Sequence, residues 1–280
     1  MTRRSTDLVS PAVDALRIID DWDARTAAAG VTRATEEIGV HGPRAVELRW
    51  ASVTKMLTGL ALLVALEEGT VELDEPAGPP GSTLRHLLSH ASGLPPDEGP
   101  PLMPPARRRI YSNYGIELAA ELVAERSGMP FTDYFRASVV EPLGLGGALR
   151  GSAAWGYRGP LDDLLKLGRE LLAPRLVARE TLDEATSVQF PGLAGVLPGW
   201  GRMEPNDWGL TFELRDHKSP HWTSQHNSPQ TFGHFGAAGT FLWVDPEAGV
   251  ATGVLTDREF GDWAIEAWPR LSDTVLAEVS

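Results

Sequence analysis

A helix begins within the run Trp50-Ala51-Ser52-Val53-Thr54-Lys55-Met56-Leu57, where a serine precedes a lysine by three positions. Residues three apart on a helix share a face, so the Ser52 hydroxyl and the Lys55 amine can meet. A helix start also has unpaired N–H groups and a positive dipole, which stabilise a developing alkoxide. A serine becomes a good nucleophile once a base takes its proton, and a desolvated lysine can be that base or support one. The run therefore predicts a nucleophile, Ser52, that is activated by Lys55.

The residues after Lys55 separate two interpretations of this pair. Ser52 and Lys55 also fit an N-cap serine followed by a lysine whose ammonium reaches solvent. Residues 56–66, however, are apolar on every side of the predicted helix, which is typical of a buried helix. A lysine on such a helix is buried and needs a partner. This setting favours the catalytic interpretation.

Two further short motifs lie downstream, Tyr111-Ser112-Asn113 before a predicted helix and His234-Phe235-Gly236 in a glycine-rich run. Taken alone, Tyr111 fits a half-buried tyrosine, and the second motif fits an ordinary tight turn. Gly236 would let two backbones approach closely. The specificity comes from the order of the three motifs along the chain.

Apolar periodicity predicts a chain with helices in its middle and strands toward both ends. Helices are expected at 11–24, 52–66, 84–89, 114–128, 131–140, 160–172, 178–186 and 263–279, and strands at 30–35, 45–50, 208–215, 240–245 and 249–256. Residues 246–249 form a turn, so the last two strands should pair as a hairpin. The expected class is α+β, an antiparallel sheet flanked by N- and C-terminal helices with a mostly helical insertion. Residues 1–51 and 190–280 would form the sheet domain and residues 52–189 the helical domain, with the active site between them.

The composition excludes several classes of function. The 280 residues carry a formal net charge of -13, which argues against nucleic acid or an anionic membrane surface as a partner. The chain has no cysteine, which excludes disulfides, thiol catalysis and thiolate metal sites. The first residues lack the apolar run of an export signal, and residues 56–66 are too few to span a bilayer. We therefore expect a cytoplasmic protein without a membrane span.

Several segments together resemble one known family. The run 50–57, followed by residues 68–76, 83–95, 111–115 and 141–145, is similar in order and content to the serine β-lactamase and penicillin-binding protein-like superfamily. The Tyr-Ser-Asn motif stands where class A enzymes have Ser-Asp-Asn, so the resemblance is to the class C-like branch. It covers about residues 45–145 and resumes near residue 230. It implies a beta-lactamase/transpeptidase-like fold.

The resemblance also implies an acyl-enzyme mechanism. Ser52 would attack a carbonyl, and Tyr111 would accept or relay its proton, with the Lys55 cation lowering the tyrosine pKa. Asn113 would orient Lys55 and a substrate oxygen. Which of Lys55 and Tyr111 is the acylation base stays open. The backbone N–H groups of Ser52 and Ala237 would form an oxyanion hole.

The resemblance also places His234 where most lactamases have the lysine of a Lys-Thr-Gly motif. A neutral imidazole holds a substrate carboxylate less well than a lysine at pH 7, which turns the expectation away from β-lactams. We expect a serine hydrolase, a carboxylesterase on small esters. The alternatives are an amide hydrolase (D-aminopeptidase, DD-carboxypeptidase or weak β-lactamase) and a non-catalytic relative that binds a ligand.

Other residue clusters give no competing site. His217, His221 and His226 match no zinc spacing, and residues 144–147 lack the pattern of a dinucleotide loop, so we expect neither a metal nor a cofactor. Arg107–Arg109 fit a solvated turn. Trp200, Trp208 and Trp222 fit core packing or a pocket wall, and His86 and His90 fit structural roles. The expected partner is a small-molecule ester or amide, and the oligomeric state is open.

Overall fold

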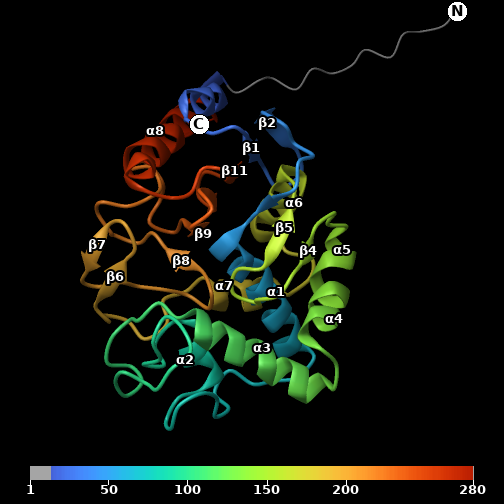
Figure 1. Ribbon diagram of the computed structural model, residues 1–280, viewed down its shortest axis with the longest axis vertical. Helices are drawn as coiled ribbons and strands as arrows, with labels where there is room; N and C mark the ends of the chain where they lie inside the picture. The colour runs from blue at the N-terminus through green and yellow to red at the C-terminus, as the bar shows by residue number, and fades with distance from the viewer. Residues whose placement is uncertain (1–13, 280) are drawn as a thin grey trace, which may run out of the picture.

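The main sheet has six antiparallel strands in the order β2-β1-β11-β10-β9-β8. Figure 1 shows the computed structural model, which describes residues 14–279. The strands are β1 (Ala27–Thr32), β2 (Glu37–His41), β8 (Glu213–Leu214), β9 (Phe232–Gly236), β10 (Thr240–Asp245) and β11 (Val250–Thr256). Strand β1 pairs with β11 from the other end of the chain, and β10 and β11 form the expected hairpin. The predicted α+β class with a sheet built from both chain ends is confirmed.

The main sheet is buried on both faces because alternate residues of each strand enter different cores. Leu242 and Val244 of β10 belong to the core that contains α6 (Leu161–Leu172). Phe241 and Trp243 belong to the core that contains α8 (Asp262–Val279) and the 3₁₀ helix η1 (Asp14–Asp21). Of the helix predicted over 11–24, residues 11–13 lie outside the described residues.

The remaining helices gather at the other end of the molecule from α8 (Figure 1). They are α1 (Thr54–Glu67), α2 (Leu84–Leu88), α3 (Asn113–Ser127), α4 (Phe131–Phe135), the π-helical turn η3 (Arg136–Val140), α5 (Glu141–Leu143) and α7 (Arg179–Ala185). Helix α1 is buried along nearly its whole length, as its apolar sequence predicts. Helix α6 lies in the predicted helical segment 52–189 but packs on β1, β10 and β11. The division into two domains stays a prediction.

Several predicted elements differ from the structure for local reasons. Helix α1 begins at Thr54 rather than Ser52, because Ala51 has a φ of 46° and residues Ala51–Val53 form a separate 3₁₀ turn, η2. The predicted strand 208–215 contributes only β8, because Thr211 has a φ of 66° and the chain turns back so that Trp208 bridges Glu213.

The predicted strand 45–50 is short and lies outside the main sheet. Only β3 (Leu48–Arg49) is extended, in a small sheet with β5 (Tyr157–Gly159) and β4 (Ala148–Leu149). A two-stranded sheet of β6 (Gly195–Leu197) and β7 (Gly201–Met203) was not predicted, nor were β2, β4 and β5. Strands β4 to β7 have only two or three residues each, too few to show an alternating pattern.

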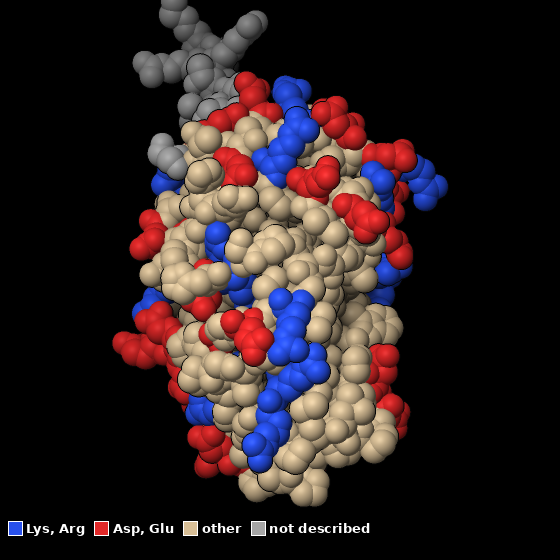
Figure 2. All heavy atoms as spheres, turned by 90° about the vertical axis from the view of Figure 1, so that its left-hand side faces the viewer, with Lys and Arg blue, Asp and Glu red and all other residues tan. Residues whose placement is uncertain are grey.

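The surface charge is unevenly distributed. Figure 2 shows Lys and Arg side chains in a line down one face, with acidic side chains clustered mostly above them and along the margins. Within residues 14–279, no helix has both the length and the apolar character needed to cross a membrane.

Candidate active site

Ser52 and Lys55 meet as their spacing predicts. Ser52 lies in η2, directly after Ala51, whose positive φ is a costly conformation for a residue other than glycine. Lys55 lies in the first turn of α1 and is completely buried. Its Nζ lies 3.3 Å from Ser52 Oγ, 2.7 Å from Asn113 Oδ1 and 3.0 Å from the backbone oxygen of Ala154. The amine is therefore held on three sides, with the serine hydroxyl on one of them.

Burial changes the protonation of Lys55. Removal from water lowers its pKa from 10.5 to about 7, against the smaller opposing effect of the Glu117 carboxylate. A lysine with this pKa is partly a free amine at neutral pH, so it can accept a proton.

The Tyr-Ser-Asn motif places its outer two residues through a helix cap. Ser112 is the N-cap of α3, and its Oγ accepts a 3.0 Å hydrogen bond from the backbone N–H three residues later. Asn113 is therefore the first helical residue and bonds Lys55, while Tyr111 precedes the helix, with its ring centroid 4.7 Å from Lys55 Nζ. The motif thus brings both predicted residues to the lysine.

The Tyr111 hydroxyl is buried and makes no hydrogen bond of standard geometry. Burial raises the tyrosine pKa above its usual value, and the nearby Ser52 hydroxyl opposes the rise only in part. The expectation that the Lys55 cation brings this pKa down is therefore wrong. The physical reason is that the same loss of water favours the neutral form of both groups.

His234 lies on β9 and is neutral. Its Nδ1–H donates a 2.7 Å hydrogen bond to the backbone oxygen of Phe235, so its buried Nε2 is an acceptor without a partner. Burial, with a smaller contribution from the Lys55 charge, lowers the imidazole pKa to about 3. The site therefore has no fixed positive charge at the position where a Lys-Thr-Gly motif would supply one.

The end of β9 is pressed against η2. A Cβ on Gly236 would lie 2.5 Å from the backbone oxygen of Trp50 and 3.0 Å from the Ala51 Cβ, so only glycine allows this approach without a shift. The contact brings Ala237 beside Ser52, and both residues line one cavity. The oxyanion hole formed by their backbone N–H groups stays a prediction.

The cavity has a volume of about 230 Å³ and a mostly apolar wall. Its lining residues are Ser52, Tyr111, Asn113, Leu197, Pro198, Trp208, His234, Phe235, Ala237 and Phe260. None of these residues is a lysine, an arginine or an acid. Most of the predicted site residues thus line one cavity. Lys55 is not in the lining but is hydrogen-bonded to Ser52, and Gly236 directly precedes the lining residue Ala237. Trp208 is the pocket-wall aromatic that the sequence left undecided.

Arg109 is not in a solvated turn, which corrects the expectation for Arg107–Arg109. It is only 2% exposed. Its guanidinium donates hydrogen bonds of 2.6–3.2 Å to the backbone oxygens of Ser89, Gln189, Phe190 and Asn206. Arg109 therefore ties together the loops around Tyr111 and Trp208. Its neighbours Arg107 and Arg108 are exposed, and the three identical residues carried no signal that one of them is buried.

His90 also lies closer to the site than expected. Its Nδ1 accepts a 3.1 Å hydrogen bond from the backbone N–H of Ser112, which supports the predicted structural role. Its ring centroid lies 4.7 Å from those of Tyr111 and Trp208, and its pKa is well below the usual value because of burial. His90 thus forms the neutral wall behind Tyr111.

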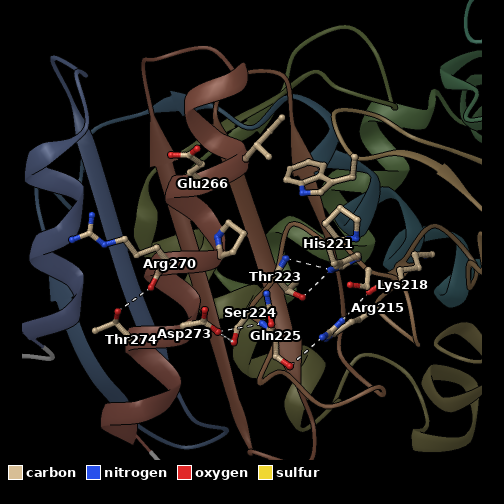
Figure 3. Close-up of a pocket in the computed structure, with 15 residues that line it drawn as sticks. Arg215, Lys218, His221, Thr223, Ser224, Gln225, Glu266, Arg270, Asp273 and Thr274 are labelled. Atoms are coloured by element: carbon tan, nitrogen blue, oxygen red, sulfur yellow. Dashed lines mark hydrogen bonds between the residues drawn. The ribbon is translucent and has the colours of Figure 1, made fainter.

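A second cavity, of about 490 Å³, lies between α8 and the loop 215–225 (Figure 3). It shares no lining residue with the Ser52 cavity. Arg215 donates hydrogen bonds to the backbone oxygens of Lys218, Gln225 and Asn227. Asp273 accepts a 3.2 Å hydrogen bond from the Gln225 N–H, so both charged groups already have partners within the cavity wall. His221 lies here and bonds Glu213 at 2.9 Å. In the described part of the chain, no group of three or more histidines and acids is arranged to hold a metal ion.

Comparison with known proteins gives a consistent set of similarities. A family model described as Beta-lactamase matches residues 20–275. The crystal structure of a beta-lactamase from Mycobacterium bovis is 50% identical, with a TM-score of 0.93 over 95% of this chain and 99% of that one. EstCE1, a hydrolase with promiscuous acyltransferase activity, is 18% identical, with a TM-score of 0.74 over 95% of this chain and 97% of its own, which bears on the fold alone.

One curated relative is similar over part of its length. The D-alanyl-D-alanine-carboxypeptidase/endopeptidase AmpH of Escherichia coli (strain K12) is 30% identical, and the match covers 35% of this chain and 35% of AmpH. The matches thus span about a third of the length of the curated relatives.

Proposed function

Because this chain belongs to the beta-lactamase family, whose members are serine hydrolases, we propose that it hydrolyses small esters through an acyl-enzyme on Ser52. Membership confirms the family resemblance and the beta-lactamase/transpeptidase-like fold expected from the sequence. The ester preference is the further step, and the cavity beside Ser52 carries it.

Lys55 is the acylation base in this proposal. A free amine has two N–H donors and one lone pair, and Asn113 Oδ1 and the Ala154 backbone oxygen take the two donors. The lone pair then faces Ser52 Oγ at 3.3 Å. A pKa of about 7 suits this task, whereas the raised pKa of Tyr111 keeps it a neutral O–H donor.

The proposed reaction has two halves. Ser52 Oγ bonds to the ester carbonyl carbon while its proton passes to Lys55, and the oxyanion lies between the N–H groups of Ser52 and Ala237. The C–O bond to the alcohol then breaks, and the alcohol leaves with the proton that Lys55 took. Lys55 gives that proton directly, or Tyr111 donates its own O–H proton and is reprotonated by Lys55. In the second half, Lys55 takes a proton from water as the water oxygen bonds to the acyl carbon. The bond from that carbon to Ser52 Oγ then breaks, the acid leaves, and Lys55 returns the proton to Ser52 Oγ.

The observation that carries the substrate class is the wall of the 230 Å³ cavity. The wall is mostly apolar, it contains no cationic side chain, and its histidine is neutral. Such a wall favours a small uncharged acyl group over a substrate that carries a carboxylate, because a buried carboxylate needs a positive partner. That the enzyme acts in the cytoplasm and without nucleic acid stays a prediction from the sequence.

An amide hydrolase is the second candidate, and the relatives favour it. AmpH is named for D-alanyl-D-alanine carboxypeptidase and endopeptidase activity, and the Mycobacterium bovis protein is named a beta-lactamase. The acyl-enzyme would be the same. The leaving group would be an amine, which needs its proton from Tyr111 or Lys55 before it departs.

The test compares kcat/KM for p-nitrophenyl butyrate, nitrocefin and a D-alanyl p-nitroanilide, together with mass spectrometry of the stopped reaction. We expect fast turnover of the ester and an acyl adduct on the peptide that contains Ser52. Ser52→Ala should abolish both, whereas Ser138→Ala, which removes a hydroxyl from η3, should change neither. Faster turnover of either amide substrate than of the ester would support the second candidate. Neither adduct nor turnover, with ligand binding kept in Ser52→Ala, would identify a non-catalytic relative.

A further inference from the structure

Glu117 connects the helix that carries Asn113 to the environment of Lys55. It lies four residues after Asn113 on α3, so the two side chains share a face of the helix. Its carboxylate accepts hydrogen bonds from the Ser152 hydroxyl and from the backbone N–H groups of Ala153 and Ala154, the latter two at 3.2 and 3.4 Å. Glu117 thus fixes the segment 152–154, which has no helix or strand to hold it.

That segment contacts α1 at two points. The backbone oxygen of Ala154 accepts a 3.0 Å hydrogen bond from Lys55 Nζ, and that of Ala153 accepts a 2.6 Å bond from Thr58 Oγ1, one helical turn later. Helix α3 therefore holds the Lys55 amine by two routes, one directly through Asn113 and one through Glu117 and the segment 152–154. Loss of the second route would free the amine to turn away from Ser52.

Glu117 also acts on Lys55 through the negative charge of its carboxylate. No carboxylate in residues 14–279 lies within ion-pair distance of Lys55 Nζ, and the Glu117 charge is the influence that opposes the effect of burial on its pKa. The other titratable groups near Lys55 are Tyr111, His90 and His234, all of which burial keeps neutral. An ammonium at this position is therefore balanced by Glu117.

We propose that Glu117 is a positioning residue for the proposed acyl-enzyme chemistry, holding Lys55 toward Ser52 through the segment 152–154 and serving as the counter-charge of its ammonium. The proposal deepens the function proposed above and rests on it. Glu117 belongs to neither the Ser-x-x-K motif nor the Tyr-Ser-Asn motif. Its proposed role follows from the packing of α3 against the segment 152–154.

The first experiment is the pH dependence of kcat/KM for the best ester in three variants. Glu117→Gln removes the charge and keeps the shape, so the acid limb should move to lower pH by on the order of one pH unit. Glu117→Asp keeps the charge but shortens the reach, so the limb should stay in place while kcat falls about tenfold. Glu121→Gln, one turn later on the exposed face of α3, should behave like wild type. An unmoved limb in Glu117→Gln would reduce Glu117 to a structural residue.

The second experiment does not need turnover. The chain has three lysines, Lys55, Lys166 and Lys218, so the ¹³Cε resonances of isotope-labelled lysine can be assigned by substitution. The Lys55 signal should titrate at lower pH in Glu117→Gln than in wild type or Glu121→Gln. An unchanged Lys55 titration would overturn the proposal even in an active enzyme. A shifted titration in a protein that turns over no substrate would contradict the proposed function and leave the counter-charge role standing.

Discussion

Replacement of Lys55 by methionine should stabilise the protein at pH 7 while it abolishes the proposed activity. Methionine is unbranched and apolar, and it fills nearly the space of the lysine stem. Lowering the pKa of an amine from 10.5 to about 7 on folding corresponds to a cost of about 5 kcal/mol at or below pH 7. Loss of the three hydrogen bonds of Nζ offsets about 3 kcal/mol of the gain. The variant should therefore be more stable by about 2 kcal/mol, or roughly 4 °C in Tm.

The sign of this difference should reverse with pH. Between about pH 7 and 10.5 the unfolded wild-type chain holds a proton on Lys55 that the folded protein lacks, so wild-type stability rises with pH. The rise approaches about 1.4 kcal/mol per pH unit, and Lys55→Met does not share it. The advantage of the variant should vanish near about pH 8.5 and become a deficit above it.

Urea unfolding at pH 6, 7, 8 and 9.5, followed by tryptophan fluorescence, measures the difference directly. Lys166→Met on α6 is the control, because Lys166 is partly exposed and should show no reversal. Ester hydrolysis by Lys55→Met should fall by about 10²- to 10⁴-fold through loss of the base. A variant that is less stable than wild type at pH 7, by an amount that does not change up to pH 9.5, would refute a buried free amine.

Three other substitutions test the scaffold of the site. Gly236→Ala should lower kcat/KM by about 100-fold, since its Cβ would displace the backbone that carries the proposed oxyanion donor. Gly146→Ala should not, because its Cβ would meet only Asp163 Oδ1, at an ordinary contact distance of 3.8 Å. Arg109→Met should lower the free energy of unfolding by about 3 kcal/mol in urea titrations by leaving backbone oxygens unpaired, and the exposed Arg108→Met should leave it unchanged. Glu213→Gln should lower the free energy of unfolding by about 3 kcal/mol at pH 7, because it leaves the buried Lys218 ammonium without its carboxylate partner. The deficit should shrink below pH 4.5, because Lys218 and His221 outweigh burial and lower the Glu213 pKa to about 2, so the charge of the wild-type carboxylate stabilises the fold less and less toward that pH. A pH-independent deficit would contradict that last account.

Much of the site follows from local sequence. The spacing of Ser52 and Lys55 places them one helical turn apart, and the apolar residues on all sides of that helix predict that the lysine is buried. Ser112 caps α3 and so places the residues on either side of it. The last two strands and their turn predict a hairpin through period-two alternation. Each of these inferences depends on residues only a few positions apart. Over that range, the regular geometry of a helix, strand or turn determines where the side chains lie relative to one another.

The rest depends on contacts between residues far apart in the chain. Glu117 accepts hydrogen bonds from the segment 152–154, and Arg109 donates hydrogen bonds to backbone oxygens of several loops. Neither set of contacts produces a periodic pattern in the sequence from which it could be predicted. The protonation of Lys55, Tyr111 and His234 is set by how much water the whole fold removes from them, which no short motif reports. The Ser-x-x-K pattern thus predicts where the nucleophile lies. The protonation of Lys55, the proposed base, and the mostly apolar wall of the cavity depend on how the helices pack against the edge of the sheet.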